Sequence, residues 1–468
     1  MKSYLTIALF AMLALAVYGA AVEVFIKVFF LLLYKMVSIS SSSDGCQSSS
    51  STSSNEKITF LTACVFIVGE VAGGGMLSLP HATAQSGWYG IGLIIYCALA
   101  SAIGGICLAE CWLILEERYP QYRHGLTRKP FATIGYHSFG KYSSALVSIL
   151  INVTRIGSGT VFFLLTSSLI QSITKSFINI TQCHWILIVP LVCFFPYLLG
   201  SPGDFWPIAY LATGSSVIGS VLLMITLVIQ IAKNGVSDDF HIESMESFTT
   251  SYGVILFAYS GAASFPNFQN DMKEKEKFPR AVMFGYVALV LIYVPVAALG
   301  YATEGANVST NIIDHLSNGV MVTIVRCCFL AHCMAVIFIT TNPVLLDLEE
   351  LFRVPKQFGW KRVLLRTCIL LLMTFLALTF PNFGEVLDLI GSTTIVLLSF
   401  ILPLVFYIKL CYDSKKNKTW PNRNLSYPLL ATFAIVIIST IIAGIASTYS
   451  TLKHFTSLKS ACYLSNWN

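Results

Sequence analysis

Three glycines, a carboxylic acid and a proline interrupt an apolar stretch of this chain. Residues 69–82 read GEVAGGGMLSLPHA and lie inside a run long enough to cross a bilayer. A helix broken at membrane depth leaves backbone N–H and C=O groups without partners, at a cost of several kcal/mol per group. A break therefore persists only where it lines a cavity or binds something. The amides of Gly73, Gly74 and Gly75 would begin a half-helix whose positive end suits a carboxylate.

A second apolar stretch is interrupted in a similar way. It reads FAYSGAASFPNFQNDM over residues 257–272, and the carbonyl groups that end its first half could accept hydrogen bonds from an ammonium group. We therefore predict a ligand-binding site at Gly73, Gly74, Gly75, Phe257, Ala258, Tyr259, Ser260 and Gly261. No acid or base is placed to recognise a charged side chain on the ligand.

A few ionisable residues lie at membrane depth, where each costs about 2.5 to 3.5 kcal/mol at the centre of a span. Glu70 adjoins the first break and has two open roles: it takes a coupling proton, or it pairs with Arg155. Arg326 is expected to pair with Glu385 or Asp388, either as an extracellular gate or as a packing bridge.

The composition is that of a membrane protein. Of the 468 residues, 55% are hydrophobic and 11% are charged, whereas soluble domains carry about 25% charged residues. The 13 cysteines show no CxxC pair and no metal-ligand spacing, and no HExxH, GxSxG or Walker motif occurs. We therefore expect no metal, no cofactor and no enzymatic activity.

Eleven apolar segments predict an all-α polytopic membrane protein. They cover about 58–86, 88–114, 142–172, 184–199, 203–232, 249–268, 280–302, 317–350, 362–380, 383–408 and 427–449. The interrupted segments are the first and the sixth. Because five is odd, the second group of five starts on the opposite face of the membrane, which gives a 5 + 5 inverted repeat followed by an eleventh helix. Glycine and proline are common in membrane helices and would explain either break alone, but two breaks at corresponding positions are typical of LeuT-type transporters.

Lys and Arg indicate the orientation of these helices. The connections after the second, sixth, eighth and tenth segments hold 19 of them, and the other connections with the C-terminal tail hold 4. The first set is expected to be cytoplasmic, so the N terminus of the core is cytoplasmic and the C terminus is extracellular or luminal. Glycosylation sequons at Asn179 and Asn307 fall on the noncytoplasmic face, in agreement. Both the plasma membrane and an endolysosomal membrane remain open.

The first 56 residues allow several interpretations. Residues 1–35 are a signal-like apolar segment, an extra helix that would bring the count to twelve, or an extension that precedes a true start at Met36. Residues 36–56 are rich in serine and are expected to be disordered and cytoplasmic. The transmembrane domain is expected at 57–450, and residues 451–468 form a C-terminal tail.

The interrupted segments also resemble a known family. The stretches GEVAGGGMLSLPHATAQSGW (69–88), RKPFATIGYHSFGK (128–141), FAYSGAASFPNFQNDM (257–272), FPRAVMFGYVALVLIYVPVAALGYATEG (278–305) and TNPVLLDLEELF (341–352) are similar to motifs of the amino acid/auxin permease family, over about Glu56 to Ser450. The resemblance implies eleven helices on a LeuT-type core and amino acid transport driven by a proton or sodium gradient.

Two departures from the family pattern stand out. Glu304 stands where an apolar aromatic residue is usual, and the loop between the seventh and eighth helices has no cysteine. Some relatives carry an outer-face disulfide, for which only Cys183 with Cys462 remains as a candidate here.

The coupling ion is a proton or sodium. In LeuT-type proteins a sodium ion can sit between the unwound first helix and hydroxyls of the eighth, where Thr340 and Thr341 lie in this chain. Threonine in a membrane helix more often bonds a carbonyl of its own helix. His81 and His332 are further candidates to carry a proton, against the simpler role of satisfied polar side chains.

With this resemblance, the sequence predicts a secondary active transporter of small to medium neutral amino acids that works by alternating access. The alternative is an amino acid sensor of the same fold that no longer transports. We expect an amino acid and the lipid bilayer as partners and no nucleic acid, and the oligomeric state stays open.

Overall fold

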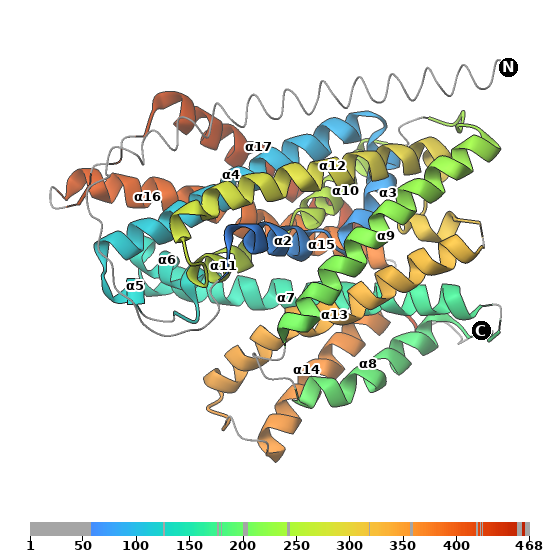
Figure 1. Ribbon diagram of the computed structural model, residues 1–468, viewed down its shortest axis with the longest axis horizontal. Coiled ribbons are helices and arrows are strands. Elements are labelled where there is room, and N and C mark those ends of the chain that lie inside the picture. Colours follow the sequence, from blue (N-terminus) through green and yellow to red (C-terminus); the bar gives the residue numbers. More distant parts are fainter. Residues whose placement is uncertain are drawn as a thin grey trace.

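The computed structural model is a bundle of helices (Figure 1). It describes residues 58–124, 127–175, 177–178, 180–199, 205–240, 244–317, 319–355, 359–417, 420–421, 423, 425–455 and 461–463. The predicted N-terminal segments, 1–35 and 36–56, lie outside the described residues.

Each of the eleven predicted segments falls on a helix or on a set of consecutive helices. In chain order these are α2 (Phe60–Val71), η2 (Gly74–Ser78) and α3 (Leu79–Ser86); α4 (Tyr89–Arg118); α7 (Lys141–Thr174); α8 (Gln182–Leu199); α9 (Phe205–Asn234); α10 (Met245–Ala258), η4 (Ala262–Ser264) and α11 (Phe265–Asn270); α12 (Phe278–Glu304); α13 (Val320–Leu351); α14 (Trp360–Thr379); α15 (Phe383–Ile390), η8 (Gly391–Ile401) and α16 (Leu402–Lys416); and α17 (Tyr427–Phe455).

Length and composition show a multi-pass helical membrane protein. Among the described residues, eight helices are long and apolar enough to cross a membrane, and α2 with η2 and α3 forms a pair bent by 48° that would make a ninth span. α8 is shorter, and α10 is separated from α11 by a break. The count of eleven spans stays a prediction.

One end of the bundle carries the basic connections, and we call it the basic end. α5 (Gln121–His124), α6 (Pro130–Phe139) and the last turns of α16 lie there, on the left in Figure 1. Ion pairs join these connections to α4 and α13, with N to O distances of 3.1 Å for Arg423 and Glu110, 2.6 Å for Lys275 and Glu116, and 3.1 Å for Lys129 and Asp347. The connections predicted to share one face of the membrane therefore do lie together.

Two local features were not predicted. The apolar pattern predicts only a connection where α6 lies, although Pro130 suits a first helical turn and Gly140, with φ of +85°, suits the end of a helix. The segment η8 is π-helical over 11 residues in the middle of the tenth predicted segment. A change from α to π hydrogen bonding leaves the apolar pattern of a fully buried helix unchanged, so the sequence carries no clear signal for it.

Candidate functional site

The first interruption lies between α2 and η2. α2 ends at Val71, and η2 begins at Gly74 with no side chain capping its start. A Cβ atom on Gly75 would lie 2.8 Å from the Cα atom of Ala258, at the end of α10. Backbone cannot move aside as a flexible side chain can, so glycine at position 75 lets the two interrupted helices approach each other.

The second interruption lies between α10 and η4. α10 ends at Ala258, and Gly261 has φ of +153°, which residues with a Cβ atom rarely adopt. A Cβ atom on Gly261 would lie 2.7 Å from Cγ2 of Val71, the last residue of α2. Each break therefore has a glycine that faces the other break, and the two breaks meet inside the bundle.

Tyr293 joins the two breaks. It lies near the middle of α12, and its hydroxyl oxygen lies 2.7 Å from the carbonyl oxygen of Val71 and 2.9 Å from that of Ala258. The hydroxyl has one hydrogen, which the last carbonyl groups of both interrupted helices share. A buried tyrosine usually finds such a partner for its hydroxyl.

The carbonyl groups predicted to hold an ammonium already accept hydrogen bonds. The donors are the amide of Ser260 for Phe257 (2.9 Å), the hydroxyl of Tyr293 for Ala258 (2.9 Å) and the hydroxyl of Ser101 for Tyr259 (3.2 Å). Each carbonyl oxygen has two lone pairs, so an ammonium group can share these oxygens or displace the present donors.

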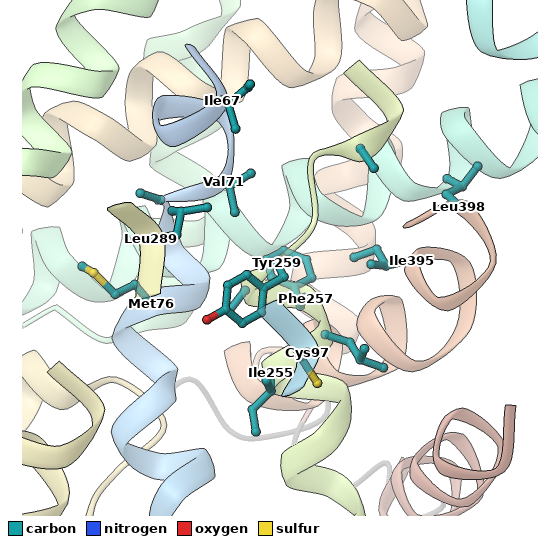
Figure 2. Packing of buried hydrophobic residues seen from close by; sticks show 14 of the residues in the cluster. Ile67, Val71, Met76, Cys97, Ile255, Phe257, Tyr259, Leu289, Ile395 and Leu398 are labelled. Atoms are coloured by element: carbon teal, nitrogen blue, oxygen red, sulfur yellow. The ribbon is translucent and has the colours of Figure 1, made fainter. Parts of the chain in front are cut away.

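The side chains around the breaks are buried. Phe257 is 4% exposed and Tyr259 is 0% exposed. Figure 2 shows both side chains at the centre of the packing, with Val71 and Met76 on one side and Ile395 on the other. The breaks are therefore enclosed by apolar and aromatic groups, where electrostatic interactions with a zwitterion are strong.

A cavity of about 650 Å³ opens at the basic end. Its walls come from α6, α7, α13 and the segment around η4, and its lining includes Lys129, Arg155, Ala263, Asn267, Pro343 and Asp347. Ala263 lies directly after the second break. The cavity therefore leads from the basic end to the interrupted part of α10 and α11.

At the opposite end, aromatic side chains pack against one another. The ring centroid of Tyr301 lies 5.0 Å from that of Trp88 and 5.1 Å from that of Phe240. The imidazole Nδ1 of His81 lies 2.6 Å from the carbonyl oxygen of Val308. These contacts tie α3 and α12 to the connections that follow α9 and α12.

Glu70 lies between the two breaks. Its side chain is exposed, and its Oε1 accepts a hydrogen bond of 2.7 Å from the hydroxyl of Ser264 on η4. Its charge acts on Arg155, as does that of Asp347, but no ion pair within 4.0 Å joins Arg155 to another described residue. The direct contact of Glu70 is thus with the second break, and the predicted pair with Arg155 is a longer-range interaction.

The two threonines proposed as sodium ligands lie on α13. Thr341 donates to the carbonyl of Ile337, four residues earlier in its own helix, at 2.6 Å. The carbonyl of Ala72 in the first break accepts a hydrogen bond from Ser216 on α9. The hydroxyl of Thr341 thus bonds its own helix. Thr340 precedes it on the same turn and is partly buried.

Asp388, one of the two partners predicted for Arg326, contacts α17 instead, and the alternative partner Glu385 stays a prediction. Asp388 is 2% exposed and accepts hydrogen bonds from Ser447, at 2.6 Å, and from Thr451, both on α17. The carboxylate whose charge acts on Arg326 is that of Asp314, in the short turn η7 (Ile312–His315). The sequence indicates the depth of Asp388 in the membrane but not which helices are neighbours of α15. In the structure α15 packs on α10 and α17, so Asp388 meets hydroxyl groups of α17.

The predicted outer-face residues are only partly described. Asn307 is exposed, and its side-chain amide donates to Asp239 at 3.5 Å, whereas Asn179 lies outside the described residues. Cys183 and Cys462, the candidate pair, are joined by a disulfide. Glycosylation of either asparagine stays a prediction.

Sequence reasoning missed the hydroxyl groups that hold the breaks. Tyr293, Ser101 and Ser216 come from three long helices, and each bonds a carbonyl group in one of the breaks. A tyrosine two residues before Pro295 in an otherwise apolar segment was the available signal for Tyr293. The two serines had none, because serine is common in membrane helices.

Comparisons with known proteins identify a family for this chain. The family described as transmembrane amino acid transporter protein matches residues 56–450. The chain is 26% identical over 378 residues to amino acid transporter AVT1H of Arabidopsis thaliana, covering 78% of this chain and 85% of that one. It is 25% identical over 405 residues to AVT3B of the same plant, covering 83% and 92%. A crystal structure of MhsT in complex with L-phenylalanine aligns at 12% identity with a TM-score of 0.48, over 85% of this chain and 100% of that chain. The chain belongs to the transmembrane amino acid transporter family, and it is therefore a membrane transport protein rather than an enzyme.

Proposed function

We propose that this protein is a secondary active transporter that carries small to medium neutral amino acids, driven by a proton or sodium gradient. The observation that carries the proposal is the meeting of the two interrupted helices, whose last carbonyl groups share the hydroxyl of Tyr293. The start of η2 offers amides to a carboxylate, and the end of α10 offers carbonyl groups to an ammonium.

The proposed selectivity follows from the side chains at the breaks. A Cβ atom on Gly74 would lie 2.8 Å from Cδ2 of Leu165 and 3.3 Å from the ring of Phe162, both on α7. With Tyr259 these residues would surround a bound amino acid with apolar and aromatic groups, which supports a neutral rather than a charged amino acid.

Alternating access is supported by the difference between the two ends of the bundle. The cavity of about 650 Å³ reaches the second break from the basic end, while aromatic rings and the contact of His81 with Val308 pack the opposite end. We propose that this conformation is open to the cytoplasm and that a second conformation opens the other end.

The proposed topology has eleven spans. The pairs α2 with α3 and α10 with α11 are the interrupted first and sixth helices of a 5 + 5 inverted repeat, and α17 is the eleventh. The basic end is cytoplasmic, so the N terminus of the core is cytoplasmic and Asn307 is extracellular or luminal. The membrane is the plasma membrane or an endolysosomal membrane.

Uptake into proteoliposomes tests the proposal. Radiolabelled glycine, L-alanine, L-serine, L-leucine and L-phenylalanine are offered under an imposed proton gradient, an imposed sodium gradient, or neither. We expect at least one of these amino acids to accumulate only with a gradient. Saturable binding without accumulation under either gradient would contradict transport and would identify a sensor instead.

A further inference from the structure

His332 lies on α13 beside the first break. Its side chain is 0% exposed, and its Nδ1 lies 2.9 Å from the carbonyl oxygen of Ala212 on α9. Its Nε2 has no hydrogen-bond partner among the described residues. A Cβ atom on Gly73 would lie 3.1 Å from Nε2, and the ring of Phe162 meets the imidazole edge to face with centroids 6.3 Å apart. A buried nitrogen without a partner is thus aimed at the residue that precedes η2.

The carbonyl of Ala212 determines which nitrogen of neutral His332 carries the hydrogen. A carbonyl oxygen only accepts, so Nδ1 must donate, and Nε2 then presents a lone pair towards Gly73. In the protonated ring both nitrogens donate. The group that faces the first break is therefore an acceptor in neutral His332 and a positively charged donor after protonation.

That change matters to a carboxylate bound at the start of η2. A lone pair on Nε2 repels a carboxylate oxygen, whereas a charged N–H donor forms one of the stronger hydrogen bonds in proteins. A carboxylate that leaves water for a buried site also needs a compensating charge. Protonated His332 supplies both the donor and the charge, next to the amides of Gly74 and Gly75.

We propose that His332 binds the coupling proton and that its Nε2–H donates to the carboxylate of the bound amino acid, so that proton and substrate bind together. The inference rests on the proposed transport function and narrows its driving ion to a proton. By thermodynamic linkage, each of the two ligands strengthens the binding of the other. Transport of the pair then requires no direct contact between Glu70 and the substrate.

Several charged and titratable groups lie on the elements packed around the ring of His332. They are Cys64 and Glu70 on α2, Lys141, Tyr142 and Arg155 on α7, Tyr210 and Lys233 on α9, and Arg326, Cys327, Cys328, Cys333, Asp347, Glu349 and Glu350 on α13. Glu70 is the other candidate for the proton, but its carboxylate contacts Ser264 on η4 rather than the start of η2.

Amino acid binding as a function of pH tests the proposal. The purified protein is titrated with the amino acid of the panel that the wild type takes up best, over about pH 5 to 8, where histidines titrate. In the wild type we expect the Kd to rise by about tenfold per pH unit once His332 loses its proton. In His332→Gln the amide can still donate but does not titrate, so the Kd is expected to be independent of pH.

His184→Gln is the matched control. The Nδ1 of His184 also has a hydrogen-bond partner, the hydroxyl of Thr181 at 2.7 Å, but the residue lies on α8, which packs on α7 and α14. The Kd of this variant is expected to follow the wild type at each pH.

A second measurement uses the wild type alone, so a folding defect in His332→Gln does not remove the test. In weakly buffered solution with a pH-indicator dye, binding of the same amino acid is expected to take up protons, approaching one per amino acid at the upper end of the pH range. Binding without proton uptake would overturn the proposal.

The titrations of the variants give a further outcome against the proposal. A pH-dependent Kd that persists in His332→Gln and disappears in Glu70→Gln would overturn it and assign the proton to Glu70. Failure of the wild type to bind or take up any amino acid of the panel would overturn the proposed transport function itself.

Discussion

The hydroxyl of Tyr293 lies 2.7 Å from the carbonyl oxygen of Val71, so α12 holds the broken end of α2 in place. The same hydroxyl reaches the end of α10. A rearrangement that moves one break relative to the other must therefore change a hydrogen bond of Tyr293.

Tyr293→Phe is expected to destabilise the protein and to weaken amino acid uptake. It removes the donor for two buried carbonyl groups, and an unsatisfied buried group costs about 1 to 3 kcal/mol. Thermal unfolding in detergent and uptake into proteoliposomes measure the two effects. Tyr301→Phe is the control, because Tyr301 is buried on the same helix and its hydroxyl has no partner among the described residues. Equal behaviour of the two variants would contradict a special role for Tyr293.

Gly75→Ala is expected to abolish uptake while expression is preserved. The added Cβ atom would lie 2.8 Å from the backbone of Ala258, so the two breaks would have to separate. Gly74→Val is expected to have the same effect, since it places a larger side chain against Leu165 and Phe162. Gly92→Ala on α4 serves as the control, because nothing lies within 4 Å of its Cβ position. Normal uptake by Gly75→Ala would show that close contact of the breaks is not required.

Cysteine labelling is expected to show from which side the cavity opens. Ala263 lines the cavity that opens at the basic end, whereas Asp238 is exposed in the connection after α9 at the opposite end. In intact cells that carry the protein at their surface, a membrane-impermeant thiol reagent should label Asp238→Cys but not Ala263→Cys, after subtraction of wild-type labelling. In permeabilised cells the reagent should label both variants. Labelling of Ala263→Cys in intact cells would mean that the basic end faces outward or that the cavity opens to the outside.

The stability of the wild type relative to that of Asp314→Asn is expected to decrease as the pH rises. Partial removal of this carboxyl from water raises its pKa from 3.8 to about 6. The charges of Arg326 and His315 and a hydrogen bond from Asn311 act in the other direction. The folded state thus holds the proton more tightly than the unfolded state, so stability gained from protonation is lost as the pH passes through about 6. The melting temperature of the wild type minus that of Asp314→Asn should fall as the pH rises from about 4 to about 6 and should change little above that. A difference that stays constant would show that Asp314 has an ordinary pKa.

The position of the two breaks could be predicted from the sequence because glycine and proline act locally. Gly73 to Gly75 and Gly261 end their helices where the residue types require it, whatever surrounds them. The approximate ends of the long helices followed from apolar runs for the same reason. α6 was missed although Pro130 and Gly140 marked both of its ends, because its amphipathic sequence is too short to resemble a span.

Lateral contacts could not be predicted. The sequence offers Glu385 and Asp388 as partners of Arg326 because they lie in the outer half of the bundle, but Asp388 bonds Ser447 and Thr451 on α17. The contact of Tyr293 with both breaks likewise depends on which helices are neighbours. The sequence gives the depth of a residue in the membrane but not the rotation or the neighbours of its helix.

A structure determined with a bound amino acid tests the central claim most directly. We expect the carboxylate of the amino acid within about 3 Å of the amides of Gly74 and Gly75, and its ammonium group against the carbonyl groups at the end of α10. An amino acid bound away from both breaks, or a first or sixth helix that becomes continuous when the amino acid binds, would contradict the proposed site.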